Sequence, residues 1–248
     1  MTAAADAPPQ EMGLFARVIG VLTSPKATFE RVVAKPRPAG VLLISALLIG
    51  LSTGAPQFTA SGRQAAIDSQ VQNTERMQGK PVTEEQFARI ERFSHYGPVF
   101  AVIGTLIFMP VMVIIFGGLY WVVFNTVLGG TASFKQVLAI VTHSQVIPAI
   151  GTAIGAPIQF MQGKMTAGGP FNLGALVPML DENSPLATLL GATSVFAIWG
   201  LIVTAIGLAV LYRRKALNIS IGLIVTYLLI GYTIISTVGS MFGGGQGR

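Results

Sequence analysis

The sequence predicts an all-α polytopic membrane protein, a bundle of five transmembrane helices with a cytoplasmic N-terminal amphipathic segment. Three observations support this fold class: five long apolar runs, a chain that is 52% hydrophobic and only 10% charged, and basic residues that flank the runs. Soluble domains carry about 25% charged residues, and about 20 apolar helical residues cross a hydrocarbon core. We therefore expect one membrane domain, over residues 39–241.

Residues 1–38 are expected to form a cytoplasmic arm with short amphipathic helices. A second helix should begin at Ser24-Pro25, because serine caps a helix and proline fits its first turn. The face of the first helix either lies along the headgroup plane or packs beneath the bundle, and the sequence favours neither. That face carries Leu14, Phe15, Val18, Ile19 and Leu22.

The five spans are expected at about 39–58, 98–128, 134–160, 186–212 and 217–241, followed by a flexible tail at 242–248. The second is too long for a straight crossing, and a kink at Pro110 would account for its length. Between the first two spans lies the one sizeable polar segment. Thr83 and Gln86 in that segment fit a capping box, which predicts a helix start.

The third span carries the most polar content. Gly151 and Gly155 have the spacing that permits close helix approach in lipid, and with Pro110 and Pro148 they are the candidate helix-packing residues. Tyrosines aside, His143 is the only ionisable residue at membrane depth, and Gln136 precedes it by seven residues on the same face. Intramembrane ionisable groups are functional candidates, whereas neutral His and Gln also bond neighbouring helices. Both interpretations stay open.

Charge in the short loops predicts the orientation. The N-terminal side holds nine bases and three acids, against seven of each on the other side. Because short loops rich in Lys and Arg stay inside, we expect a cytoplasmic N-terminus, an external C-terminus and an inner-membrane location. Arg213, Arg214 and Lys215, in the turn between spans four and five, are candidate contacts for anionic lipid headgroups.

Several function classes find no support. The sequence contains no nucleotide-binding, hydrolase or metal-binding motif, so we expect no catalytic residue, metal or cofactor. The basic residues flank the spans, which is not the pattern of a nucleic-acid partner. No Asp or Glu lies within a span, which argues against an ion-coupled carrier.

Three stretches resemble the Yip family of five-span membrane proteins, in its bacterial branch: LTSPKATFERVVAKPRP, LGGTASFKQVLAIVTHSQVIPAI and SPLATLLGATSVFAIWGLIVTAIGLAVLYRRKA. The resemblance covers roughly Leu14 to the end of the fifth span. It implies an inner-membrane protein but supplies no biochemistry. Eukaryotic members are partners of Ypt-type small GTPases; of their Asp-Leu-Tyr-Gly-Pro signature only Tyr96-Gly97-Pro98 is present, so that partner does not carry over.

Two functions remain. The first is a non-enzymatic scaffold that organises the membrane through helix packing and contacts with lipid, other membrane proteins or a second copy. The alternative is a small-solute or ion transporter or channel with a polar path near His143. A dry, tightly packed interior would favour the scaffold, and a water-filled path would favour the transporter.

Overall fold

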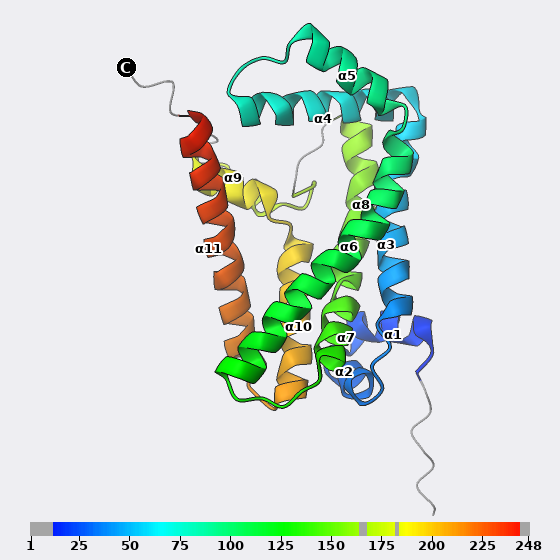
Figure 1. Cartoon of the computed structure of the whole chain (residues 1–248), viewed down its shortest axis with the longest axis vertical. Helices are drawn as coiled ribbons and strands as arrows, with labels where there is room; N and C mark the ends of the chain where they lie inside the picture. Colours follow the sequence, from blue (N-terminus) through cyan, green and yellow to red (C-terminus); the bar gives the residue numbers. More distant parts are fainter. Residues whose placement is uncertain (1–11, 164–167, 182–183, 244–248) are drawn as a thin grey trace, which may run out of the picture.

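Five helices of the structure are long and apolar enough to cross a membrane. This computed structural model describes residues 12–163, 168–181 and 184–243, and within them the regular elements are all helices. The chain enters at one end of the bundle and leaves at the other (Figure 1). The expected all-α, five-span architecture is confirmed. Its candidate spans are Ala39–Phe58, Gly97–Val127, Phe134–Gln162, Val195–Tyr212 and Ala216–Thr237.

Two short helices, α1 (Leu14–Thr23) and α2 (Pro25–Ala34), occupy the N-terminal end of the bundle (Figure 1). Proline stands in the first turn of α2, as expected, but the side chain of Ser24 makes no capping hydrogen bond. The buried face of α2 carries Thr28, Phe29 and Val32, and the helix packs against the third and fourth spans. The helix α2 is therefore part of the core of the bundle. Residues 1–11 lie outside the described residues.

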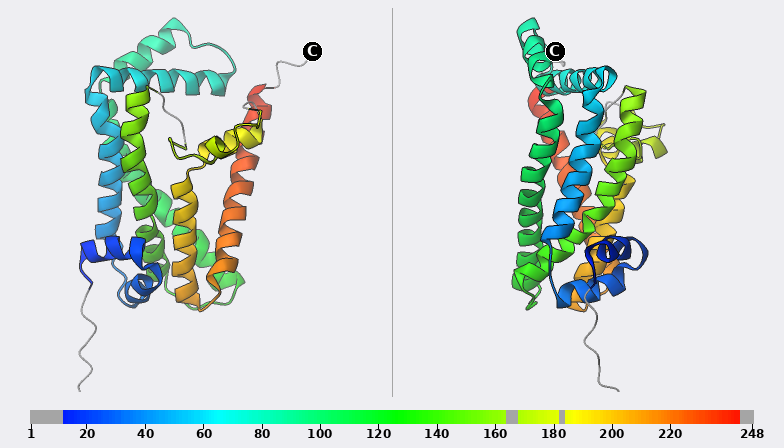
Figure 2. Two further views of the ribbon diagram at one scale, coloured as in Figure 1. Left: turned by 180° about the vertical axis from the view of Figure 1, so that it is seen from behind. Right: turned by 90° about the vertical axis from the view of Figure 1, so that its right-hand side faces the viewer.

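The first two spans pack closely along their length. The first consists of α3 (Ala39–Gly54) and a 3₁₀ turn (Ala55–Phe58). The second, α6 (Gly97–Val122), is continuous through Pro110 and ends in a π-helical turn (Val123–Val127). It runs beside α3 and then obliquely toward the last two spans (Figure 2). This oblique course accommodates an apolar stretch longer than the bilayer is thick.

The third span is two helices in line, α7 (Phe134–Ser144) and α8 (Val146–Gln162), separated at Gln145. The cause is Pro148, which has no N–H to donate to the carbonyl of Ser144. The expected range of 134–160 agrees with this span within two residues.

The range expected for the fourth span, 186–212, is wrong as one continuous helix. The structure has α9 (Pro185–Ala192), which lies across the bundle, and the spanning helix α10 (Val195–Tyr212) (Figure 1). Ser194 caps α10, its hydroxyl accepting from the Phe196 N–H at 3.2 Å. Backbone bonds from Leu173 to Thr193 and from Val195 to Phe171 hold this junction extended. The cap at Ser194 and these backbone bonds therefore separate α9 from α10.

The last span, α11 (Ala216–Gly243), stands outermost and packs mainly on α10 and α9. The tail expected at 242–248 begins inside this helix at its first two residues, and residues 244–248 lie outside the described residues. At the far end, α4 (Ala60–Gln78) and α5 (Glu84–Ser94) lie across the bundle. The capping box of Thr83 and Gln86 is present at the start of α5.

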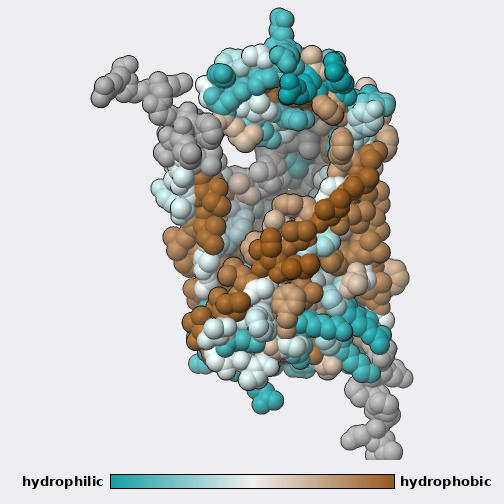
Figure 3. Space-filling view, in the orientation of Figure 1, coloured by the Kyte–Doolittle hydropathy of each residue, from teal (hydrophilic) through white to brown (hydrophobic). Residues whose placement is uncertain are grey.

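The surface of the molecule has the layering of a membrane protein. An apolar band covers the middle, and hydrophilic residues gather at both ends (Figure 3). The band includes large exposed side chains of α6, among them Phe100, Ile107 and Phe108. Such a surface is stable in lipid, because apolar side chains there face no water.

Candidate functional site

The start of α7 is built around Gln136. Ser133 and Gln136 form a capping box: the Gln136 N–H donates to the Ser133 hydroxyl, and the Ser133 N–H donates to Gln136 Oε1 at 2.9 Å. Gln136 Nε2 donates to the carbonyl of Val33, at the end of α2, at 3.1 Å. Gln136 therefore fastens the N-terminal arm to the third span.

His143 lies fully buried near the end of α7. Its Nδ1 lies 2.7 Å from the carbonyl oxygen of Ala139 in the same helix, which accepts the Nδ1 proton. Nε2 has no hydrogen-bond partner among the described residues, and the same holds for the buried hydroxyls of Ser45 and Thr142. The ring is thus held by a local bond within its own helix.

The structure does not join the two candidate polar residues. Gln136 and His143 are two turns apart, about 10 Å along the axis at 1.5 Å per residue. Each has a different partner, Val33 for one and Ala139 for the other. The two side chains were expected on one helix face, and in the structure each is bonded to a partner of its own.

The candidate packing glycines of the third span meet different partners. A Cβ at Gly151 would collide with the ring of Phe196 on α10, so Gly151 makes the expected helix contact. A Cβ at Gly155 would lie 3.1 Å from Cδ of Pro170, in the loop before α9. Pro148 packs on α10, where a Cβ at Gly200 would lie 3.3 Å from its Cδ. Pro110, inside α6, is half-buried.

A closer helix contact lies at Gly50 and Gly54 of α3, which sequence reasoning missed. A Cβ at Gly50 would stand 3.0 Å from Cα of Val102, and one at Gly54 would stand 2.8 Å from the carbonyl oxygen of Pro98. Both neighbours are backbone atoms of α6, so here the two backbones touch. The signal was present, because these residues have the same small-xxx-small spacing as Gly151 and Gly155.

The turn before α11 closes the N-terminal end of the bundle. The Tyr212 hydroxyl donates to Asn125 Oδ1 at 2.9 Å, and its ring stacks on Phe124 with centroids 4.8 Å apart. Arg214 Nη2 donates to the carbonyl of Leu128 at 3.0 Å. Arg213 caps α10 in the left-handed conformation, with φ at 52°.

One residue of the basic cluster has a structural role in this turn. Arg213, Arg214 and Lys215 are all exposed, and Arg214 also ties the turn to the end of the second span. Asn125 Nδ2 and Trp121 Nε1 both donate to the carbonyl of Ala132, at 2.7 Å and 2.9 Å. A headgroup contact at the turn would add to a structural role that Arg214 already has.

No group of three His, Asp or Glu side chains that could hold a metal occurs among the described residues. Several polar side chains of the spans bond within their own helix or at helix ends, those of Ser45 and Thr142 have no partner among the described residues, and glycines set the helix spacing. Among the described residues the arrangement is one of helix packing.

The fold and these contacts define a five-span helical membrane protein. A model of the Yip1 domain family matches residues 19–238, most of the chain. The chain belongs to the Yip1 domain family. It is also similar to the membrane protein YknW of Bacillus subtilis (strain 168), with 26% identity over 229 residues, 92% of this chain and 89% of that protein. No solved structure matches the chain.

Proposed function

We propose that this protein is a non-enzymatic integral scaffold of the bacterial inner membrane. It organises its surroundings through helix packing and through contacts with lipids, other membrane proteins or a second copy. The N-terminal arm and the turn before α11 face the cytoplasm, and the C-terminus lies outside. The sequence supports this proposal by containing no catalytic motif, and the family match supports it by the class of protein.

The observation that carries the proposal is the uneven burial of the spans. Of the most apolar stretch of each span, 56% is buried in the third, but only 11% in the second and 11% in the fifth. Two whole helices therefore present their sides to the bilayer, while the third span forms the centre. Exposed helix sides of this extent are the surfaces on which a membrane scaffold contacts lipid or partner helices.

The competing transporter function depends on His143. It draws on four buried polar atoms of the spans without partners among the described residues, at Ser45, Thr142, His143 and Ser236. Against it stand the local bond of His143 to Ala139 and the commitment of Gln136 to Ser133 and Val33. A transport path needs polar groups that face a continuous space, whereas Gln136 is bonded to its helix cap and to α2, and the Nδ1 of His143 is bonded to its own helix.

The test compares His143→Gln and His143→Leu in cells that lack the native gene, with protein level and detergent melting measured in parallel. If His143 is structural, the growth phenotype of the deletion is rescued by Gln and largely rescued by Leu, because one local bond is replaced or lost. Loss of rescue by both variants at normal abundance and normal melting would contradict the proposal, since neither side chain titrates near neutral pH.

A further inference from the structure

We propose that α1 is an interfacial anchor whose outer face inserts into the bilayer at the N-terminal end of the bundle. Phe15 and Ile19 reach the acyl chains, and the basic side chains of the arm lie at the headgroups. The sequence left open whether this helix packs beneath the bundle or lies in the headgroup plane. The structure assigns one role to each face of the helix.

The inner face of α1 is protein core. Val21 is fully buried. The Leu14 side chain lies over Gly40, where a Cβ would come within 3.0 Å of Leu14 Cδ1. Gly20 lies against Thr28 of α2 closely enough that a Cβ there would collide with the threonine hydroxyl. The helix is therefore fixed in position and cannot turn its other face inward.

The outer face of α1 is apolar and uncovered. Phe15 is 76% exposed and Ile19 is 58% exposed. They are four residues apart, so they stand one above the other on the same side of the helix. Leaving two large apolar side chains in water on a fixed helix is unfavourable, whereas insertion among acyl chains removes that cost.

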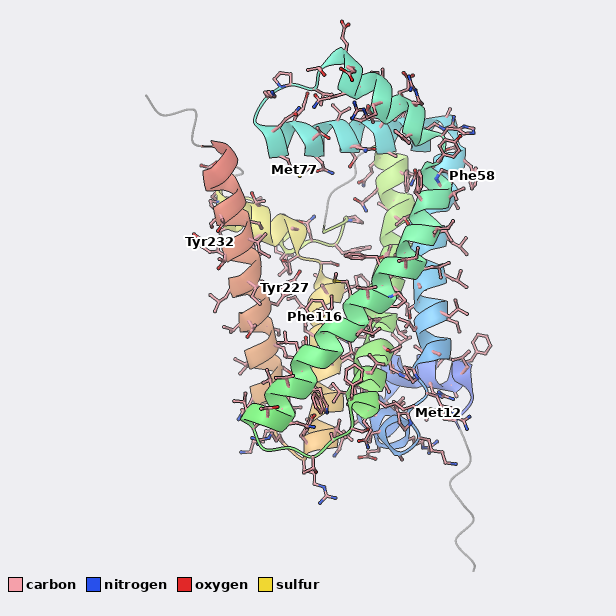
Figure 4. The ribbon with its side chains drawn as sticks, viewed as in Figure 1. Met12, Phe58, Met77, Phe116, Tyr227 and Tyr232 are labelled. Atoms are coloured by element: carbon pink, nitrogen blue, oxygen red, sulfur yellow. The ribbon has the colours of Figure 1, made fainter. Side chains whose placement is uncertain are left out.

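The position of α1 along the bundle places this face at the bilayer. The helix contacts the beginning of α3 and also both α7 and α8. The start of α8 is about 18 Å from the start of α7, at 1.5 Å per residue over twelve residues. Hence α1 lies next to the third span and to the start of α3, and Met12 marks where it begins, at the end of the bundle opposite Phe58 (Figure 4).

The surface next to α1 indicates that lipid covers the outer face of this helix. The span α3, against which α1 lies, exposes Leu43 and Leu51, at 53% and 54%. An apolar face next to a lipid-facing span continues that surface. Among residues 12–38 five bases stand against a single acid, and Lys26 and Arg31 are exposed. Apolar residues combined with flanking positive charge are what anionic bilayer surfaces bind.

The guanidinium of Arg17 holds the helix at this level. Its Nε donates to the carbonyl of Met12 at 2.9 Å, and Nη1 donates to the carbonyl of Arg37 at 3.3 Å. The bond to Arg37 joins the first turn of α1 to the segment that enters the first span. The charged group therefore lies at the entry point of the span, where long basic side chains reach the headgroups.

The experiment uses the absence of cysteine from the chain. Single variants Phe15→Cys and Ile19→Cys carry a nitroxide label in full-length protein reconstituted into vesicles that contain anionic phospholipid. Collision of the label with oxygen, which concentrates in lipid, and with a neutral nickel chelate, which stays in water, is measured by power saturation. Three reference positions are labelled in parallel: Lys26→Cys for water, Phe108→Cys for lipid, and Val21→Cys for protein interior.

The labels at positions 15 and 19 should show an oxygen-to-nickel ratio several-fold above that at position 26 and below that at position 108. Nickel access equal to that at position 26 would overturn the proposal, because the face would lie in water. Low access to both reagents, as at position 21, would also overturn it and show that protein covers the face. Both substituted side chains are exposed, and if one variant fails to fold, the other decides alone.

Discussion

At the scale of single residues, polar groups inside this bundle bond mostly to their own helix. Ser144 and Thr204 each donate to the carbonyl four residues earlier, at 3.0 Å and 2.8 Å, as His143 does. Such local bonds satisfy a polar group without a neighbouring helix. The hydroxyl of Tyr212 is different, because it donates to Asn125 on the second span and so joins two spans.

The variant Tyr212→Phe should therefore lower the free energy of unfolding by about 0.6 kcal/mol, the average for such bonds in membranes. Its melting temperature in detergent should fall slightly. It keeps the ring that stacks on Phe124 and removes only the hydroxyl. The control Tyr232→Phe changes a tyrosine that is 45% exposed on α11 and should leave melting unchanged. Equal shifts for both variants would mean that the bond to Asn125 contributes nothing.

At the scale of elements, backbone contact between α3 and α6 sets the geometry of the first two spans. Gly54→Ala should lower the melting temperature clearly, because the added methyl would stand 2.8 Å from the carbonyl oxygen of Pro98, and backbone cannot yield cheaply. Gly50→Ala should act in the same direction. Thermal unfolding in detergent measures both.

The matched control is Gly104→Ala on α6, where an added Cβ meets nothing within 4 Å. Its melting should stay the same or rise, because alanine favours helix over glycine. If Gly104→Ala and Gly54→Ala melted alike, close packing of α3 on α6 would not be the cause.

The sequence predicted the positions of the helices better than the contacts between them. Hydropathy located four of the five spans within a few residues, because apolar length is a local property of the chain. The range expected for the fourth span included Thr193 and Ser194, because two small polar residues barely change a hydropathy average. In the structure Ser194 caps a new helix there. Gly50 and Gly54 have the same spacing as Gly151 and Gly155 and were overlooked. Spacing alone does not give the partner of any of these glycines, because the partner depends on the rotation of the helix.

Gln136 shows a second limit of prediction from the sequence. It was singled out for its spacing from His143, but a glutamine three residues after Ser133 also completes a capping box, and the structure contains that capping box. The Ser-x-x-Gln pattern was readable, as the Thr83 example was. The Val33 contact was not, because it joins residues 103 positions apart in the sequence.

At the scale of the whole molecule, the described chain begins and ends at opposite ends of the bundle, as five spans require (Figure 1). We expect a reporter active in the cytoplasm to be active when fused after Lys215, and a periplasmic one to be active when fused after Arg248, because bases are concentrated in the short loops of the N-terminal side. Fluorescence and enzyme activity of paired fusions measure this. If the fusions after Lys215 and Arg248 both reported the same side, the fifth helix would not cross the membrane.

The scaffold function requires that the interior around His143 is packed and dry, whereas a transporter requires a water-filled path there. The most direct measurement is the reaction of His143→Cys with a charged, water-soluble thiol reagent in membranes, in a chain that has no other cysteine. Lys215→Cys, at an exposed position, serves as the reactive control. We predict no labelling at position 143 until the protein is denatured, and full labelling at 215. Rapid labelling of native protein at position 143 would show a water-filled path and contradict the account.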